Sequence, residues 1–253
     1  MTKNRHLNHL SYSGFCNDCG KIHSLPSDKA IPHCIELMKQ LQAHCRIDFD
    51  ISINNSNPKL STQHLYSDSG GEMLGVLVCE DADGNEIVLK AFSSTHNGVW
   101  NVEGWVSHLA DETKFMAIVN EGNLEIHPLT SYIQTLTKTS EEWNVKIIER
   151  KKISQKILSQ LFELYEVSNF KNQKRNISNA FNLKKGIPNG TGDCCAPKLL
   201  NYAAKNNLTP ISIAEFYWGK ESLSGLRKEG EFYSSCKDKC EPLLGFMLCG
   251  LNK

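Results

Sequence analysis

The sequence predicts an α/β fold, in which helices pack on a layered sheet, preceded by a small cysteine-bearing segment at the N-terminus. Three observations lead to this prediction. Apolar runs with strand and helix periodicity alternate along the second half of the chain. An apolar fraction of 40% over 253 residues suffices for a hydrophobic core. Cysteines recur as close pairs at three places: Cys16 with Cys19, Cys194 with Cys195, and Cys236 with Cys240.

Composition excludes several classes of protein. The formal net charge is zero, so no global field steers the chain toward nucleic acid or a membrane. The first residues are polar, and no run of about eighteen apolar residues occurs. We therefore expect a cytoplasmic protein without a membrane span, whose thiols are reduced. Among its ten cysteines, Cys45, Cys79 and Cys249 are expected to be buried as small hydrophobic residues.

The pattern divides the chain into three predicted segments. Residues 1–45 form a zinc knuckle and a helix, 46–70 form a polar linker, and 71–253 form the α/β domain. The linker assignment follows from its richness in Asn, Ser and Asp.

Residues 14–25 contain Phe-Cys-x-x-Cys-Gly, a spacing typical of zinc knuckles. The glycine lets backbone amides turn toward the thiolates of Cys16 and Cys19. The nearest residues that could complete four ligands are His23, His33 and Cys34. The last two lie near the start of a helix predicted over 29–43 from its apolar stripe. The alternative interpretation is a loop with two free thiols.

The α/β domain begins with a hairpin. Two β-rich runs, 73–79 and 87–92, flank an Asp-Gly turn at 81–85. The following segment, 93–106, is predicted to be a loop and carries His96 and Asn97. Apolar periodicity then predicts a long helix over 141–166, a helix over 194–206, a strand over 211–218 and a final helix over 236–248.

Residues 167–192 contain no acidic residue and several basic ones. With the neighbouring asparagines, these side chains could follow a phosphate backbone, although a solvated loop explains them equally well. The basic residues are Lys171, Lys174, Arg175, Lys184 and Lys185.

The cysteines of the second half lie at predicted helix starts, where free N–H groups and the helix dipole stabilise thiolates. Adjacent helical residues point about 100° apart, so Cys194 and Cys195 are not expected to bind one ion equally. We predict that Cys195 binds metal, that Cys194 packs, and that Asp193 caps the helix. Cys236 and Cys240, spaced i and i+4, would share a face and complete the site.

The order of hairpin, helix with a ligand, strand and cysteine pair resembles that of zinc nucleoside deaminases. The resemblance implies that Asn97 touches substrate, with His96 beside it. Two departures are evident: Ala196 and Pro197 replace the family's x-Glu, and the pair is Cys-x-x-x-Cys. Proton transfer would then fall to Asp193 or Glu215. Glu215 could instead be a surface residue or a partner of Lys198.

A cysteine hydrolase is a further interpretation. The nucleophile would be Cys194 or Cys195, since a thiol at a helix N-terminus has a lowered pKa and adjacent amides for an oxyanion hole. Its base would have to come from upstream, from His96, His108 or His127.

Three blocks of sequence also resemble the extra N-terminal region of some bacterial RNA pseudouridine synthases, those of type A for the large ribosomal RNA. They are Gly190–Leu200, Ala214–Gly219 and Phe232–Leu244, within a similarity covering about residues 70–250. The catalytic Arg-Leu-Asp of those synthases is missing. We therefore predict that this chain is not itself a pseudouridine synthase.

Together these observations predict a zinc-dependent hydrolase with a deaminase-like fold that acts on a nucleobase or nucleotide in RNA modification. The resemblance implies RNA and a pseudouridine synthase as partners. A non-catalytic RNA-binding accessory module is the first alternative, with Lys174 and Arg175 among its contacts, and the cysteine hydrolase is the second.

Overall fold

The computed structural model describes residues 10–52, 55–68, 70–182 and 186–251. Its centre is a four-stranded sheet in the order β4-β3-β7-β8, whose neighbouring strands are all antiparallel. The strands are β3 (Glu72–Glu80), β4 (Glu86–Phe92), β7 (Thr209–Trp218) and β8 (Phe232–Tyr233). Because β4 and β7 both pair with β3, they run parallel to each other on its two sides.

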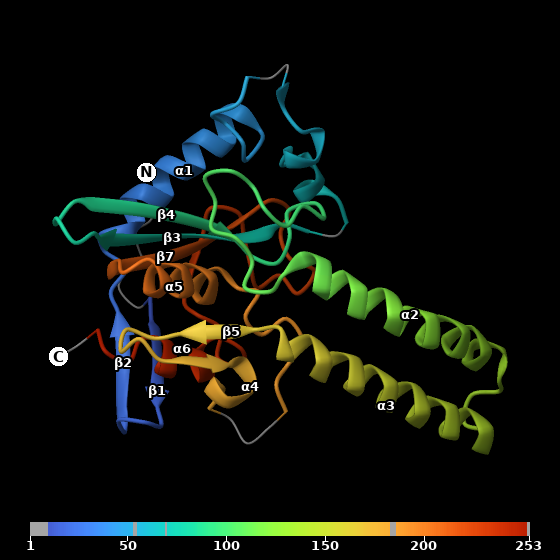
Figure 1. Cartoon of the computed structure of the whole chain (residues 1–253). Coiled ribbons are helices and arrows are strands. Elements are labelled where there is room, and N and C mark those ends of the chain that lie inside the picture. The colour runs from blue at the N-terminus through green and yellow to red at the C-terminus, as the bar shows by residue number, and fades with distance from the viewer. Residues whose placement is uncertain (1–9, 53–54, 69, 183–185, 252–253) are drawn as a thin grey trace.

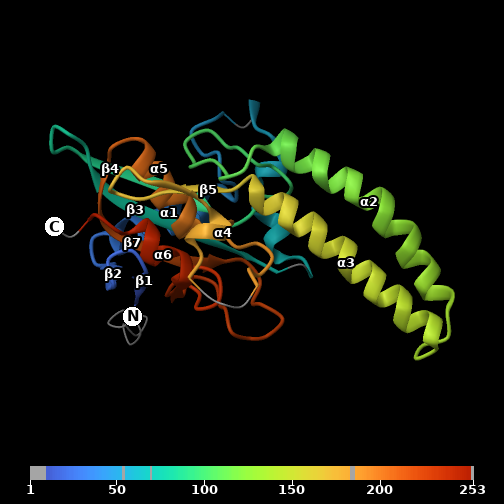
Figure 2. The same cartoon turned by 60° about the horizontal axis from the view of Figure 1, so that its bottom comes forward.

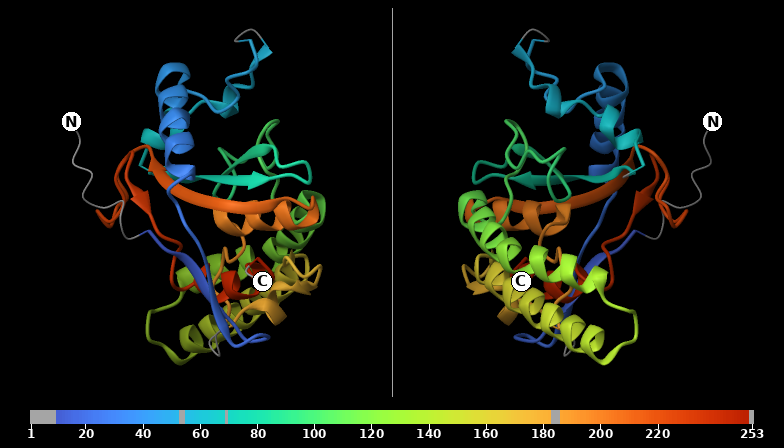
Figure 3. Two further views of the ribbon diagram at one scale, coloured as in Figure 1. Left: turned by 90° about the vertical axis from the view of Figure 1, so that its left-hand side faces the viewer. Right: turned by 90° about the vertical axis from the view of Figure 1, so that its right-hand side faces the viewer.

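Helices cover both faces of this sheet (Figure 1). Helix α1 (Ala30–His44) lies on one face and α5 (Cys195–Lys205) on the other. Figure 3 shows the sheet between these two helices, seen along its edge. Beyond α5 lie the short helix α6 (Glu241–Met247) and the hairpin of β1 (Tyr12–Cys16) and β2 (Lys21–Leu25). The result is a mixed α/β architecture, as the sequence predicts.

Strand β3 is buried over Met73–Cys79 because both of its faces are covered. Alternate residues therefore enter two separate cores. Leu77 belongs to the core shared with α5 and α6, whereas Leu74 and Val76 belong to the core beneath α1. This double burial explains why β3 reads as a continuous apolar run rather than an alternating one.

A helical hairpin separates β4 from α5 along the chain. Helix α2 (Glu112–Thr135) and helix α3 (Glu141–Glu163) begin at the N-cap side chains Asp111 and Ser140, which accept backbone N–H groups. The pair projects from the body as an arm (Figure 2). Helix α2 lies in a region, 107–140, where no element is predicted from the sequence.

The chain returns from the arm through a small two-stranded sheet and one helical turn. These are β5 (Glu166–Ser168), β6 (Lys174–Asn176) and α4 (Ile177–Ala180). They cover α5 and the end of α6, so the predicted basic loop is largely structured.

The predicted hairpin, the helices near 29–43, 141–166 and 194–206, and the strand near 211–218 are present. The segment 46–70 is not a linker between separate units. It contains 3₁₀ turns at Pro58–Leu60 and Gln63–Tyr66, and Ile47, Leu60 and Leu65 are buried in the core beneath α1. These few apolar residues therefore attach the segment to the core beneath α1.

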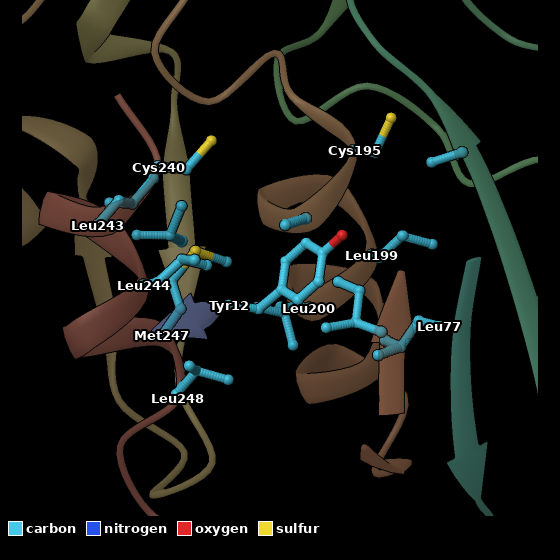
Figure 4. Packing of buried hydrophobic residues seen from close by; sticks show 14 of the residues in the cluster. Tyr12, Leu77, Cys195, Leu199, Leu200, Cys240, Leu243, Leu244, Met247 and Leu248 are labelled. Atoms are coloured by element: carbon cyan, nitrogen blue, oxygen red, sulfur yellow. The ribbon is translucent and has the colours of Figure 1, made fainter. Parts of the chain in front are cut away.

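The contact between β1 and α6 is made by backbone atoms. A Cβ atom at Gly14 would overlap the backbone of Gly245, and one at Gly245 would overlap the Phe15 carbonyl group. Only two glycines allow a strand and a helix to approach this closely. The side chains Leu243, Leu244 and Met247 hold α6 in place from the core side (Figure 4).

We predict that Gly245→Ala lowers the free energy of unfolding by about 1–3 kcal/mol, the usual cost of overpacking. Denaturant unfolding followed by circular dichroism measures the change. Gly186→Ala is the matched control, since a Cβ there meets no atom within 4 Å. Equal stability of the two variants would contradict the close β1–α6 contact.

Candidate metal centres

The knuckle hairpin gathers three candidate ligand atoms at its turn. Cys16 ends β1, Cys19 lies in the turn and His23 lies on β2. The Gly20 N–H donates to the Cys16 carbonyl oxygen across 2.9 Å, with Gly20 at a φ of 68°. The His23 Nε2 atom lies 3.0 Å from the Cys19 Sγ atom. The three residues that the sequence analysis groups here therefore do lie together.

The fourth candidate ligand comes from the far end of the chain. The Cys249 Sγ atom lies 3.7 Å from that of Cys19, close to the ~3.8 Å expected between two sulfurs on one tetrahedral zinc. Ligand atoms of Cys16, Cys19, His23 and Cys249 all lie within 4.8 Å of one another. We call this four-residue group the knuckle centre.

Neither nearby candidate completes the knuckle centre. Cys34 is fully buried on α1, and its Sγ atom donates to the Ala214 carbonyl oxygen at 3.6 Å. Helix α1 packs on the opposite face of the sheet, which carries Cys34 away from the hairpin. His33 pairs instead with Glu86, at 3.4 Å. The assignment of Cys34 as a ligand is wrong. Cys249 is buried, as the sequence predicts, and its thiol also lies among the candidate ligands.

Basic side chains surround the knuckle centre. The pKa of Lys171 is raised by its hydrogen bond to Cys249 and by the nearby Cys19 thiol. Desolvation opposes ionisation of Cys19, but hydrogen bonds from the Lys21 amide and from neighbouring thiols together lower its pKa. The lowered pKa of Cys19 favours its thiolate, the form that binds metal. Desolvation, and then the neighbouring thiols, raise the pKa of Cys249 to about 11.

The predicted RNA-binding residues have structural partners. Arg175 donates to both carboxylate oxygens of Asp18, at 3.0 and 2.7 Å, and lies over the Phe246 ring. It thereby ties the knuckle turn to β6 and α6. Lys174 forms an exposed ion pair with Glu166 at 3.8 Å. Of the other predicted contacts, Lys184 and Lys185 lie outside the described residues.

A second group of candidate ligands meets at the start of α6. The Sγ atoms of Cys194, Cys236 and Cys240 lie within 4.8 Å of one another, with Cys236 and Cys240 separated by 3.3 Å. We call this group the thiolate centre. It differs from the knuckle centre in having three protein ligands rather than four.

The two adjacent cysteines lie in the arrangement opposite to that predicted: Cys194, and not Cys195, is grouped with the other candidate ligands. Cys195 is the first residue of α5 and is completely buried, and its Sγ atom donates to the Met73 carbonyl oxygen at 3.3 Å. Its side chain lies toward β3, where Gly75 leaves room: a Cβ at Gly75 would lie 2.7 Å from that of Cys195. Cys194 is the extended N-cap residue and faces the other cysteines. Figure 4 shows Cys195 and Cys240 on opposite sides of Tyr12.

Cys236 and Cys240 do not share a helix face, because α6 begins only at Glu241. They form a turn, closed by the Cys240 N–H group donating to the Cys236 carbonyl oxygen at 3.1 Å. Hydrogen bonds from the thiols of Cys194 and Cys240, and then from the amides of Cys240 and Lys239, hold the pKa of Cys236 well below its ordinary value. The turn therefore shares with the knuckle centre two cysteines in a tight turn whose backbone amides donate to a thiol.

Glu215 lies inside the body near the thiolate centre. It pairs with Gly75 across the β3–β7 ladder, and its Oε1 atom accepts the Ala196 N–H group of α5 at 2.7 Å. Burial raises its pKa to about 7, although the Ala196 hydrogen bond works in the opposite direction. The pKa of Cys194 is raised chiefly by its hydrogen bond with Cys236, and that of Cys240 by its hydrogen bonds with Cys194 and Cys236. The negative charge of Glu215 adds a smaller contribution in the same direction. Glu215 is therefore neither a surface residue nor a partner of Lys198.

Lys198 is buried and donates to the carbonyl oxygens of Phe92 and Ser94, at 2.8 and 3.1 Å. Desolvation lowers its pKa. Through these bonds Lys198 fixes α5 to the end of β4, so it positions the helix that follows Cys194.

Asp193 does not cap α5. Its Oδ1 atom accepts from the Tyr165 hydroxyl at 2.7 Å and lies 2.9 Å from the His108 Nε2 atom. Because the His108 Nδ1 atom accepts the Ala110 N–H group, its Nε2 atom is the donor. Burial opposes ionisation of Asp193, but the hydrogen bonds from His108 and Tyr165 lower its pKa. Asp193 is thus the ionised acceptor of a polar group beside Cys194, and Glu215 is the residue that binds an amide of the helix start.

The predicted substrate contacts point elsewhere. His96 is fully buried and lies 2.6 Å from the Glu72 Oε1 atom through Nδ1. Asn97 donates to the Lys59 carbonyl oxygen at 3.2 Å. Both side chains hold the loop after β4 in place, so the structure gives neither of them a role beside the cysteines.

Each group could hold a metal ion, and the two groups differ in the number of protein ligands they offer. Four protein ligands close the coordination shell of a tetrahedral ion, whereas three leave one position for water or substrate. The knuckle centre therefore has the composition of a structural site, and the thiolate centre has that of an open one.

Comparison with known proteins gives no match: no family model, curated protein or solved structure resembles this chain significantly. None of the described helices combines the length and apolarity that crossing a bilayer requires.

Sequence reasoning missed two residues of these sites and misplaced a third. Cys249 lies in an apolar run, where burial is its common fate, and Tyr165 stands at the end of a helical pattern with no motif around it. His108 is considered only as a base for a thiol, whereas it serves Asp193. The one signal for Cys249 is that the knuckle motif lacks a fourth ligand, which leaves every distant cysteine as a candidate.

We predict two bound metal ions per chain. Cys249→Ser and Cys194→Ser should each remove one, because each deletes a ligand from a different centre. Elemental analysis of purified protein against its concentration gives the stoichiometry. Cys195→Ser and Cys34→Ser are the matched controls and should retain both ions. Loss of metal in either control, with retention in Cys194→Ser, would reverse the assignment.

Proposed function

We propose that the chain is a zinc-dependent hydrolase of the deaminase-like type, acting on a nucleobase or nucleotide in the context of RNA modification. The observation that carries the proposal is the thiolate centre, whose three candidate ligands include Cys194 at the start of α5. The buried carboxylic residue Glu215 is bonded to the same helix start through the Ala196 N–H group. A zinc ion held there would supply a Lewis acid at its open position. Thiolate-rich, tetrahedral donor sets favour zinc over magnesium or calcium.

Glu215 is suited to moving protons in such a reaction. It would take a proton from the attacking water and deliver it to the amino group that leaves as ammonia, while the carbon–nitrogen bond breaks and a carbon–oxygen bond forms. The Ala196 N–H group holds the carboxyl group in one orientation. When Cys194 is the ligand, the position of the deaminase glutamate falls on Ala196. Glu215, on β7 rather than on α5, would supply the missing carboxyl group.

Partial exposure of Cys194 and Cys236 gives the proposed reaction an approach to the thiolate centre, whereas Cys240 is buried. Asp193, with its donors His108 and Tyr165, lies on the chain next to Cys194. We assign this polar group the role of orienting the loop that bears Cys194.

We predict that Glu215→Gln keeps both metal ions but lowers the hydrolysis rate about 10²- to 10⁴-fold, the usual contribution of a general acid or base. Ammonia release from a panel of nucleosides, nucleotides and short RNAs provides the measurement. Cys195→Ser should retain activity. If the unmodified protein with two metal ions releases no ammonia from the whole panel, the deaminase proposal fails.

A non-catalytic RNA-binding module is the second candidate, and the arm supplies an observation in its favour. Exposed lysines Lys151, Lys152 and Lys156 lie along α3, where the described interactions do not pair them. We consider them better phosphate contacts than Arg175, which pairs with Asp18, and Lys174, which pairs with Glu166. The RNA context and a synthase partner rest on the resemblance of the three sequence blocks.

For this candidate we predict that Lys152→Glu with Lys156→Glu weakens RNA binding across sequences. Loss of two phosphate contacts should flatten the slope of log affinity against log salt by about 1.4 for single strands. Fluorescence anisotropy at several salt concentrations tests it, with Lys174→Glu as the control. An unchanged slope would exclude the arm as the RNA contact.

The cysteine hydrolase receives little support. Burial raises the pKa of Cys195, and the His108 ring is bonded to Asp193 and Ala110 rather than to a thiol. Within the described residues, no histidine pairs with Cys194 or Cys195.

A further inference from the structure

One short helix carries a ligand of each centre at its two ends. Cys240 directly precedes α6, and Cys249 follows its last residue, Met247, by two positions. Seven residues of α-helix span about 10 Å. The position of α6 therefore determines where both thiols lie.

The thiolate turn is continuous with the first turn of α6. The N–H groups of Leu243 and Leu244 both donate to the Cys240 carbonyl oxygen at 2.9 Å. Cys240 in turn closes the loop back to Cys236. A shift of the helix would consequently move two of the three thiolate ligands together.

The other end of α6 is held through the knuckle centre. Cys249 accepts the Phe170 N–H group at its carbonyl oxygen, across 3.1 Å, and brings its thiol to Cys19. The backbone contact between Gly14 and Gly245 leaves no layer of side chains that could absorb a displacement. Interfaces packed this closely tend to move as a unit.

We propose that metal binding at the knuckle centre fixes α6 and thereby assembles the thiolate centre, so that the two centres bind metal cooperatively. The knuckle ion would then regulate the open site as well as stabilise the hairpin. The statement that the knuckle ion regulates activity rests on the proposed hydrolase function. The coupling between the two centres does not, because it concerns metal binding alone.

Thermodynamic linkage makes the proposal reciprocal. If loading the knuckle centre tightens binding at the thiolate centre by some factor, loading the thiolate centre must tighten the knuckle centre by the same factor. Couplings between sites commonly amount to about 5- to 150-fold in affinity.

The test is titration of the reduced, metal-free full chain with cobalt(II), followed by the thiolate-to-metal charge-transfer absorption. Cys19→Ser removes a knuckle ligand that is distant from α6 in the chain, so only the thiolate centre is left to fill. We expect its affinity to fall about 5- to 150-fold below the value in the unmodified chain. Cys194→Ser, the reciprocal variant, should weaken the knuckle centre by a similar factor.

Two variants serve as controls. Cys45 is exposed, contrary to the burial predicted from the sequence, and lies outside both centres. Cys45→Ser should therefore leave both affinities unchanged. Cys19→His restores four ligands at the knuckle and should restore affinity at the thiolate centre. An unaltered affinity of the thiolate centre in Cys19→Ser would overturn the proposal.

A measurement on the unmodified chain keeps the proposal testable if a variant fails to fold. Native mass spectrometry at half-saturating zinc counts chains with no, one and two ions. Cooperativity predicts fewer one-ion chains than two independent sites of the measured affinities would give. A one-ion population at that independent level would refute the coupling. None of these readouts depends on activity, so failure of the hydrolase proposal leaves the coupling intact.

Discussion

The close approach of β1 to α6 is the constraint on which both candidate centres depend. Gly14 and Gly245 bring two backbones into direct contact, and no side chain lies between them to adjust the fit. The knuckle turn continues β1, while α6 has a cysteine beyond each end. One contact between two glycines therefore sets the position of Cys249 at the knuckle centre and of Cys240 at the thiolate centre. Arg175 reinforces it by joining Asp18 of the turn to the Phe246 ring.

The central sheet fixes the other half of the thiolate centre. Gly75 on β3 leaves a space that Cys195 of α5 and Glu215 of β7 share, so helix and sheet lie close at the point where α5 begins. Lys198 then anchors α5 to the end of β4 through two carbonyl oxygens. With Cys195 directed toward β3, the preceding residue projects in a different direction from the helix start. The thiol available to Cys236 and Cys240 is consequently that of Cys194.

Local patterns predict β3, β4, α1, α3, α5 and β7, because periodicity, turn residues and Cys-x-x-Cys spacing reflect short-range geometry. They do not predict α2, and they place the start of the final helix before that of α6. The hairpin of β3 and β4 and the position of α5 follow from these signals. Contacts between residues that are distant in the sequence cannot be predicted in this way. Whether Cys34 or Cys249 lies beside Cys19 depends on which face of the sheet each element covers, and the spacing of residues in the sequence does not indicate this. The adjacent cysteines were assigned by depth in the helix, whereas the space left by Gly75, at a distant position in the chain, decides their orientation.

The two centres also differ in how much solvent access their ligand sets would require. A closed shell of four ligands gains from being buried, because it needs no access and its ion offsets the charge of its thiolates. Under the proposed function, the open shell needs partial exposure and a protected proton carrier. Cys194 and Cys236 are partly exposed, while Glu215 is buried. Helix α6 separates the two centres by its own length and has a candidate ligand of each beyond its ends. Under the proposed coupling, the stability of the knuckle centre and the geometry of the open site would therefore depend on the same helix.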